Sequence, residues 1–84
     1  MEGSTAERPL TFGEKAVGLT FNPDQNPEVH QIKSAYAAII DMLHNMRTGN
    51  GEVISAGKAR HLSCAITMAE DAQMRAVKGI TWKD

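Results

Sequence analysis

Side chains suited to hold phosphate groups occur in two separate parts of this chain. The first part is the segment Phe12–Pro23, which contains two glycines and carries Lys15, Thr20 and Asn22. Such a segment, fixed against the start of a helix, can close over an anion through backbone N–H groups, with an ammonium, a hydroxyl or an amide adding contacts. The residue types alone equally allow a loop that only covers the end of a helical core.

The second part is a charged surface in the carboxy-terminal third of the chain. At 3.6 residues per turn, five polar residues fall within about 80° of one another around a helix; they are Arg60, Thr67, Asp71, Arg75 and Lys78. Guanidinium groups bind phosphates with bidentate geometry. The alternative is a solvated helix surface, with Asp71 and Arg75 as an i,i+4 ion pair.

Three aromatic residues are candidates for stacking on nucleobases. Phe21 lies near the end of the glycine-containing segment and Trp82 follows the last regular helical turn, whereas Tyr36 lies in an apolar helical pattern and is expected in the core. Trp82 is equally suited to a contact between subunits. We therefore expect Phe21 or Trp82 to stack on a base.

The residues that commonly perform catalysis or bind metals are not grouped in this sequence. His61 and Cys64 have a spacing that metal ligands can use, but two ligands do not make a zinc site. Glu70 and Asp71 are adjacent and point in different directions on a helix, and Asp41 stands alone, so no carboxylate cluster for magnesium is expected. We expect no catalysis, no metal and no cofactor.

Length and composition limit the class of protein. Eighty-four residues allow one small domain, and the net charge of −1 argues against a dedicated binder of a nucleic acid polymer. The second half is locally cationic, which suits a small anion. A single cysteine indicates a reducing cytoplasm, and neither a signal peptide nor an apolar run long enough to cross a membrane is expected.

Two helices are expected to position these groups. Asn26, Pro27 and Glu28 form a strong helix start, and that helix should end near Arg47, before a glycine-containing turn at residues 48–51. The second helix should begin near Val53 or Ser55 and end near Ile80. The fold class predicted is all-α: a two-helix antiparallel hairpin preceded by an ordered loop, with residues 1–11 as a flexible start and residues 12–84 as a single helical-hairpin domain.

Each predicted helix carries one apolar stripe that we expect to face inward. The stripe of the first helix consists of Val29, Ile32, Tyr36, Ile39, Ile40, Leu43 and Met46. That of the second consists of Leu62, Ala65, Ile66, Ala69, Ala72, Ala76, Val77 and Ile80, where alanines allow close helix approach. Because a two-helix hairpin buries little by itself, we expect a homo-oligomeric helical bundle.

Three stretches together resemble the bacteriophage anti-defence sponge family, across residues 12 to 82. They are the loop FGEKAVGLTFNP at residues 12–23, the helix start NPEV at 26–29, and AQMRAVKGITW at 72–82. This family shares a helical-hairpin domain between the anti-CBASS cyclic-nucleotide sponge and the Thoeris anti-defence sponge. Arg75 departs from the family pattern, in which a tryptophan is expected at this position.

The resemblance implies a non-catalytic viral protein of immune evasion, in the cytoplasm of the infected bacterial host. It implies a hexamer that sequesters cyclic dinucleotides and cyclic trinucleotides without cleaving them. The alternatives are a Thoeris-type sponge for cyclic ADP-ribose isomers and, in another class, a ligand-free structural assembly. We expect the ligand-binding residues to come from the loop (Lys15, Thr20, Phe21 and Asn22), from the second helix (Arg60, Arg75 and Lys78) and from Trp82 beyond it.

Overall fold

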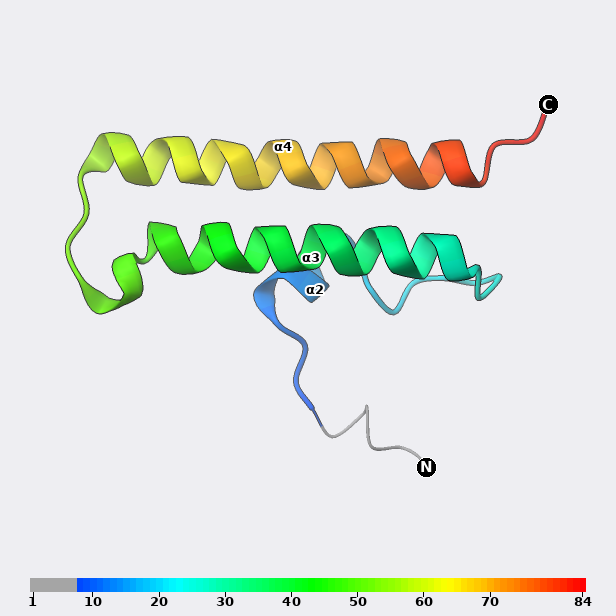
Figure 1. Ribbon diagram of the computed structural model, residues 1–84, viewed down its shortest axis with the longest axis horizontal. Helices are drawn as coiled ribbons and strands as arrows, with labels where there is room; N and C mark the ends of the chain where they lie inside the picture. Colours follow the sequence, from blue (N-terminus) through cyan, green and yellow to red (C-terminus); the bar gives the residue numbers. More distant parts are fainter. Residues whose placement is uncertain (1–7) are drawn as a thin grey trace.

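Two long antiparallel helices form the body of the protein in a computed structural model that describes residues 8–84 (Figure 1). Helix α3 spans Pro27–Arg47 and helix α4 spans Ala56–Ile80, which confirms the predicted all-helical hairpin. Residues 1–7 of the expected flexible start lie outside the described residues. No helix within residues 8–84 combines the length and the apolar character needed to span a membrane.

The ends of both helices follow from the local sequence. The Asn26 side chain accepts hydrogen bonds from the backbone N–H groups of Glu28 and Val29, and the Ser55 hydroxyl accepts one from Lys58. The connection contains the 3-10 turn η1 (Gly49–Gly51), in which Asn50 adopts a φ of 50°. A left-handed backbone is accessible to asparagine and glycine, so this turn is as the sequence predicted.

The expectation of a loop from residue 12 was wrong for its first half, because Phe12–Val17 forms the short helix α2. Thr11 and Glu14 form a reciprocal capping box, in which each side chain accepts from the other residue's backbone N–H. Gly18 ends the helix with a φ of 63° and donates to the carbonyls of Glu14 and Lys15. Caps at both ends thus stabilise a helix that its glycine disfavours.

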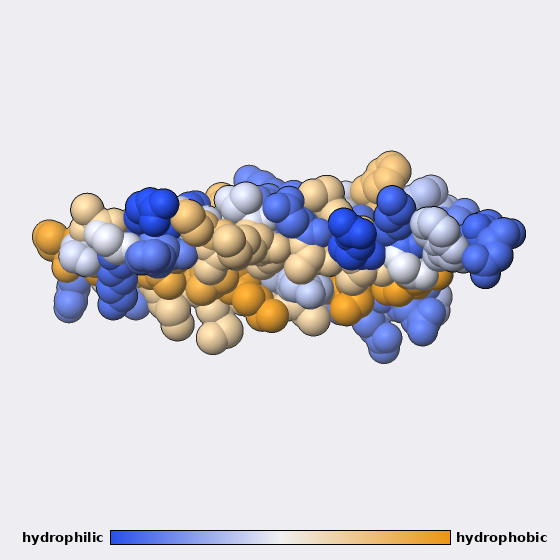
Figure 2. All heavy atoms as spheres, turned by 90° about the horizontal axis from the view of Figure 1, so that it is seen from above, coloured by the Kyte–Doolittle hydropathy of each residue, from blue (hydrophilic) through white to orange (hydrophobic). Residues whose placement is uncertain are grey.

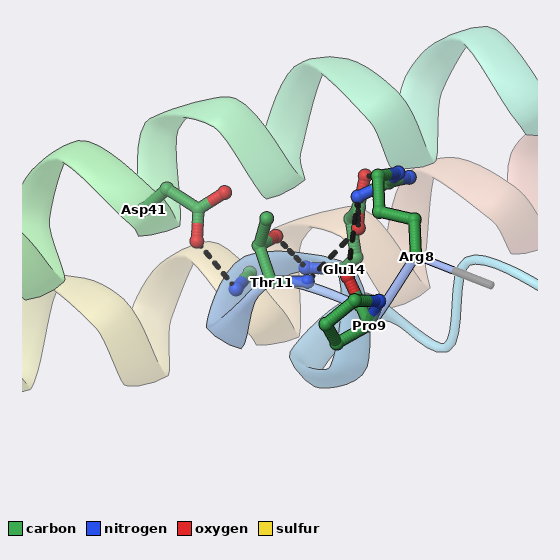
Figure 3. A network of polar contacts seen from close by, with 6 residues as sticks. Arg8, Pro9, Thr11, Glu14 and Asp41 are labelled. Atoms are coloured by element: carbon green, nitrogen blue, oxygen red, sulfur yellow. Dashed lines mark hydrogen bonds and ion pairs between the residues drawn. The ribbon is translucent and has the colours of Figure 1, made fainter.

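Helix α2 lies against α3 at a point where only glycine fits (Figure 1). A Cβ atom at Gly13 would collide with the backbone carbonyl of Ala37 and lie 3.0 Å from Cγ of Asp41. The Gly13 N–H instead donates a 2.7 Å hydrogen bond to Oδ1 of Asp41 (Figure 3). This carboxylate therefore satisfies an orphan N–H group in the first turn of α2.

A second contact joins the start of α2 to both long helices. The Phe12 ring stacks on His44 with ring centroids 4.2 Å apart, and the Arg47 guanidinium lies 5.1 Å from the Phe12 ring centroid. Arg47 also donates through Nε to Nδ1 of His44 and through Nη1 to the hydroxyl of Ser63 on α4. Arg47 thus connects α2, α3 and α4.

The core is small and is centred between all three helices. Its buried apolar members are Val17, Ala37, Ile40 and Ile66, with Tyr36, Leu43 and Ala69 packed against them. The predicted inward stripes are partly wrong, since Ile39 is 47 % exposed, Met46 is 44 % exposed and Ala72 is exposed. The reason is that α3 must cover α2 as well as α4, so its buried side is rotated toward α2.

This rotation leaves one broad side of the molecule uncovered. Ile39, Met42 and Met46 lie on the side of α3 opposite the α2 contacts at Ala37 and Asp41, counted at about 100° per residue. The Cα trace measures 44 × 37 × 12 Å, a single layer of helices. Figure 2 shows apolar side chains gathered along the lower side of this slab.

Candidate functional site

A tight turn after α2 carries Thr20 and is fixed by a buried lysine. The backbone N–H of Phe21 donates to the Gly18 carbonyl at 2.9 Å, which closes the turn. Lys33 on α3 is only 5 % exposed, and its ammonium donates to the carbonyls of Gly18 at 2.9 Å and Phe21 at 2.6 Å. Sequence reasoning missed Lys33, because a lysine among apolar residues normally extends into solvent.

The two residues after Thr20 have different surroundings. The Phe21 ring is 73 % exposed, with the Lys33 ammonium 5.5 Å from its centroid. The Asn22 amide instead exchanges two hydrogen bonds with the backbone of Asn26, at 2.9 and 3.1 Å. Asn22 therefore holds the chain at the entrance of α3, while Phe21 presents a ring face to solvent.

A cleft of about 680 Å³ lies on one side of the turn, and we call it the threonine cleft. It is lined by Thr20 and Asn22 together with Arg8, Gln25, His30, Leu10 and Leu19. Gln25 adopts a φ of 51°, a conformation that non-glycine residues rarely adopt and that recurs at binding sites. The volume falls in the range of small-molecule sites, and the guanidinium, hydroxyl and amides offer donors to an anion.

A second cleft of about 450 Å³ lies between the turn and α4, and we call it the lysine cleft. Its charged residues are Lys15 and Lys33, and its other side-chain walls come from Ala16, Val17, Phe21, Gln73, Met74 and Val77. A smaller hollow of about 290 Å³ connects Phe21 and Asn22 with Val77 and Thr81. The turn therefore sits beside the carboxy-terminal half of α4, close to the third motif of the sequence.

The structure gathers only part of the predicted site. Lys15, Thr20, Phe21 and Asn22 surround one turn, whereas Arg60 lies about 25 Å along α4 from Val77 at 1.5 Å per residue. Within one chain Arg60 is therefore remote from the two clefts.

The remaining predicted residues lie on or beyond the exposed side of α4. Arg75 and Lys78 are exposed, and within residues 8–84 Arg75 forms no ion pair with Asp71. Lys78 lies 6.0 Å from the ring of Trp82, which is 62 % exposed and borders a hollow of about 180 Å³ with Asp24 and Asn26. These side chains point to solvent and are available to a ligand or to another subunit.

Arg8, at the rim of the threonine cleft, is oriented by Glu14. Its guanidinium makes a bidentate contact with the carboxylate at 2.9 and 3.1 Å (Figure 3). This hydrogen bonding lowers the pKa of Glu14, with the Thr11 backbone N–H as the next contribution, and raises the pKa of Arg8. The pair links Arg8 at the cleft rim to α2, and the sequence analysis gave Arg8 no role.

Comparison with known proteins identifies the family. The family model described as "Acb2/Tad1, hairpin domain" matches residues 14–81, which includes α2 from Glu14 onward, the turn, α3 and α4. No curated protein and no solved structure gave a match. The matched range covers most of the chain and contains the turn, the lysine cleft, and the threonine cleft except for Arg8 and Leu10. The chain therefore belongs to the Acb2/Tad1 hairpin family, the anti-defence sponge family that its sequence motifs resemble.

Proposed function

We propose that this protein is an anti-CBASS sponge, which binds cyclic dinucleotides and cyclic trinucleotides without cleaving them in the cytoplasm of an infected bacterium. Family membership supports a sponge-like anti-defence function. The main structural support for cyclic nucleotides as ligands is the turn Gly18–Phe21, which is fixed by Lys33 and has a cleft on each side. Both clefts combine cationic groups for phosphates with apolar walls for bases.

The proposal includes a homo-oligomer, with a hexamer expected. Ile39, Met42 and Met46 form an exposed apolar surface on a single helical layer, and stable domains bury such a surface against a second layer. Because Arg60 is far from Thr20 within one chain, a ligand contacts both only where two chains meet. A second copy thus supplies the cover for the surface and a route by which Arg60 joins the site.

The test is a titration of the purified protein with cyclic di-AMP and cyclic tri-AMP by calorimetry. Loss of a phosphate contact removes roughly 1.5–3 kcal/mol, so Arg60→Ala should weaken at least one ligand by roughly ten- to hundredfold, and Thr20→Ala by less. Lys58→Ala, an exposed lysine of α4 outside the predicted site, is the matched control. If both mutants bind every ligand as the parent does, these two site assignments are wrong.

Binding without cleavage is measured on the same complexes. Heat denaturation should release the cyclic nucleotide chemically intact, as shown by chromatography against the untreated ligand. Linear products would instead assign the protein to an enzyme class. A parent protein that binds none of these ligands, nor a cyclic ADP-ribose isomer, would contradict the sponge function itself.

A further inference from the structure

His44 joins α2 to the end of α3 through one face and one edge of its ring. The face stacks on the ring of Phe12, the first residue of α2, with an interplanar angle of 10°. At the edge, Nδ1 of His44 accepts a hydrogen bond from Nε of Arg47 at 3.1 Å. Because a guanidinium can only donate, Nδ1 carries no proton, and the ring is neutral with its proton on Nε2. This hydrogen bond therefore exists in only one protonation state of His44.

Protonation of His44 is incompatible with this arrangement. A proton at Nδ1 turns the acceptor into a donor, so that two donors face each other where one hydrogen bond was. It also places a second positive charge beside Arg47, whose Nε lies 3.1 Å from Nδ1, and like charges at this distance repel. The same guanidinium lies 5.1 Å from the Phe12 ring centroid. A displacement of Arg47 therefore removes a contact with α2 as well as one with His44.

The groups around His44 offer little compensation for the added charge. Within residues 8–84 His44 forms no ion pair with a carboxylate. Asp41, one turn earlier on α3, already accepts from a backbone N–H of α2, and Glu14 of α2 is held in a bidentate ion pair. From α4 the cluster is met by the uncharged hydroxyl of Ser63. The carbonyls at the end of α3 favour positive charge, but Arg47 in the same turn already supplies it.

We propose that His44 makes the attachment of α2 to the hairpin sensitive to pH. When His44 takes up a proton at Nδ1, Arg47 moves away from it, the contact of Arg47 with the Phe12 ring is lost, and the start of α2 detaches from α3 more often. The hydrogen bond from Arg47 to Ser63 joins α3 to α4 without His44, so the hairpin remains folded. This inference does not depend on the proposed function.

The test is amide hydrogen exchange of the full chain at about pH 7.5 and about pH 5.5, on either side of about 6.5, where an unperturbed imidazole titrates. Protection of the Lys15 N–H, which donates to the Thr11 carbonyl, should be about tenfold lower at the lower pH after correction for intrinsic exchange. Protection in the middle of α4 should not change. Glu14 stays ionised across this range, because hydrogen bonds from Arg8 and from the Thr11 backbone hold its pKa below 4.5.

Two variants distinguish His44 from the other histidines. Asparagine keeps a side-chain acceptor near the position of Nδ1 and does not titrate, so His44→Asn should protect α2 equally at both pH values. His61 is exposed on α4, and His61→Asn should retain the tenfold difference of the parent. A pH dependence in His44→Asn as large as that of the parent would overturn the proposal.

An NMR titration of the parent gives a second measurement that needs no variant. The ring signals of His44 and the methyl signals of Val17, which is buried at the other end of α2, should change with the same midpoint. Different midpoints, or equal protection of α2 at both pH values in the parent, would overturn the proposal. If His44→Asn leaves α2 unprotected at both pH values, the two midpoints in the parent decide. All these outcomes are independent of whether the protein binds a cyclic nucleotide.

Discussion

The backbone N–H of Gly13 donates a 2.7 Å hydrogen bond to the carboxylate of Asp41, and no side chain on Gly13 would fit between the two helices. We predict that Gly13→Ala displaces α2 and lowers the free energy of unfolding by about 1–3 kcal/mol, the usual cost of overpacking. Chemical denaturation measures this cost.

The chain provides a matched glycine as the control for this prediction. A Cβ atom at Gly57 in α4 would meet nothing within 4 Å, so Gly57→Ala should stabilise the protein by about 0.5–1 kcal/mol. Equal effects of the two substitutions would contradict the close approach of α2 to α3. Asp41→Ala should cost about 1–3 kcal/mol, because it leaves the Gly13 N–H without its acceptor.

A fall in pH should destabilise α2 before it unfolds the hairpin of α3 and α4. The hydrogen bonds from Arg8 and then from the Thr11 backbone lower the pKa of Glu14 below its ordinary value of 4.5. A lowered pKa in the folded state contributes stability above pH 4.5, and this contribution is lost as the pH falls through the folded value. The raised pKa of Arg8 adds nothing further in this range, because arginine stays charged.

The measurement for this pH dependence is amide hydrogen exchange. Protection of the Lys15 N–H, which donates to the Thr11 carbonyl at 3.0 Å, should fall between pH 7 and pH 3, while the amides in the middle of α4 stay protected. In Arg8→Ala, the protection of the Lys15 N–H should differ less between pH 7 and pH 3. Equal loss of protection in α2 and α4 would indicate global unfolding instead.

Replacement of Arg47 is predicted to destabilise the protein more than replacement of an exposed arginine. It contacts Phe12, His44 and Ser63, so Arg47→Ala should lower the free energy of unfolding by about 1–3 kcal/mol. Arg60→Ala, at an exposed position of α4, should cost less than about 0.5 kcal/mol in the ligand-free protein. A cost for Arg47→Ala no greater than for Arg60→Ala would show that these contacts contribute nothing to the fold.

The uncovered side of α3 predicts how the assembly can be broken. If the proposed assembly forms through this apolar surface, Ile39→Asp should reduce the mass measured by light scattering toward that of one chain, because it places a charge in the contact. Helical content by circular dichroism should be retained, since Ile39 is 47 % exposed in the single chain. Asn45→Asp, at an exposed position of α3 about 120° from Ile39 around the helix, should leave the mass unchanged.

The sequence was sufficient to predict the helices whose ends carry strong signals. Asn26 acts as the N-cap where it was expected, Ser55 caps the second helix at one of the two expected starts, and the glycines of residues 49–51 form the turn. Helix α2 was missed although Thr11 and Glu14 have capping-box spacing, because the glycines at 13 and 18 suggested a loop. Gly18 is in fact the left-handed residue that ends this helix.

The candidate site was less predictable than the fold. Thr20 and Lys15 could be selected by residue type, but the two most informative buried polar residues, Lys33 and Gln73, could not. Lys33 lies four positions before the buried Ala37, and Gln73 lies seven positions after the buried Ile66, so both share the inward sides of their helices. They could not be selected because lysine and glutamine are usually exposed, whatever the helical period.

The attachment of the segment Gly13–Phe21 to α3 has a consequence for insertions and deletions. Its two attachment points on α3, Lys33 and Asp41, lie eight positions apart, and they bind Phe21 and Gly13, which are also eight positions apart. One added residue between Gly13 and Val17 would turn the rest of α2 by about 100° and detach one end. Homologues should therefore vary in side chains here but keep this spacing, and differ in length mainly at residues 48–55.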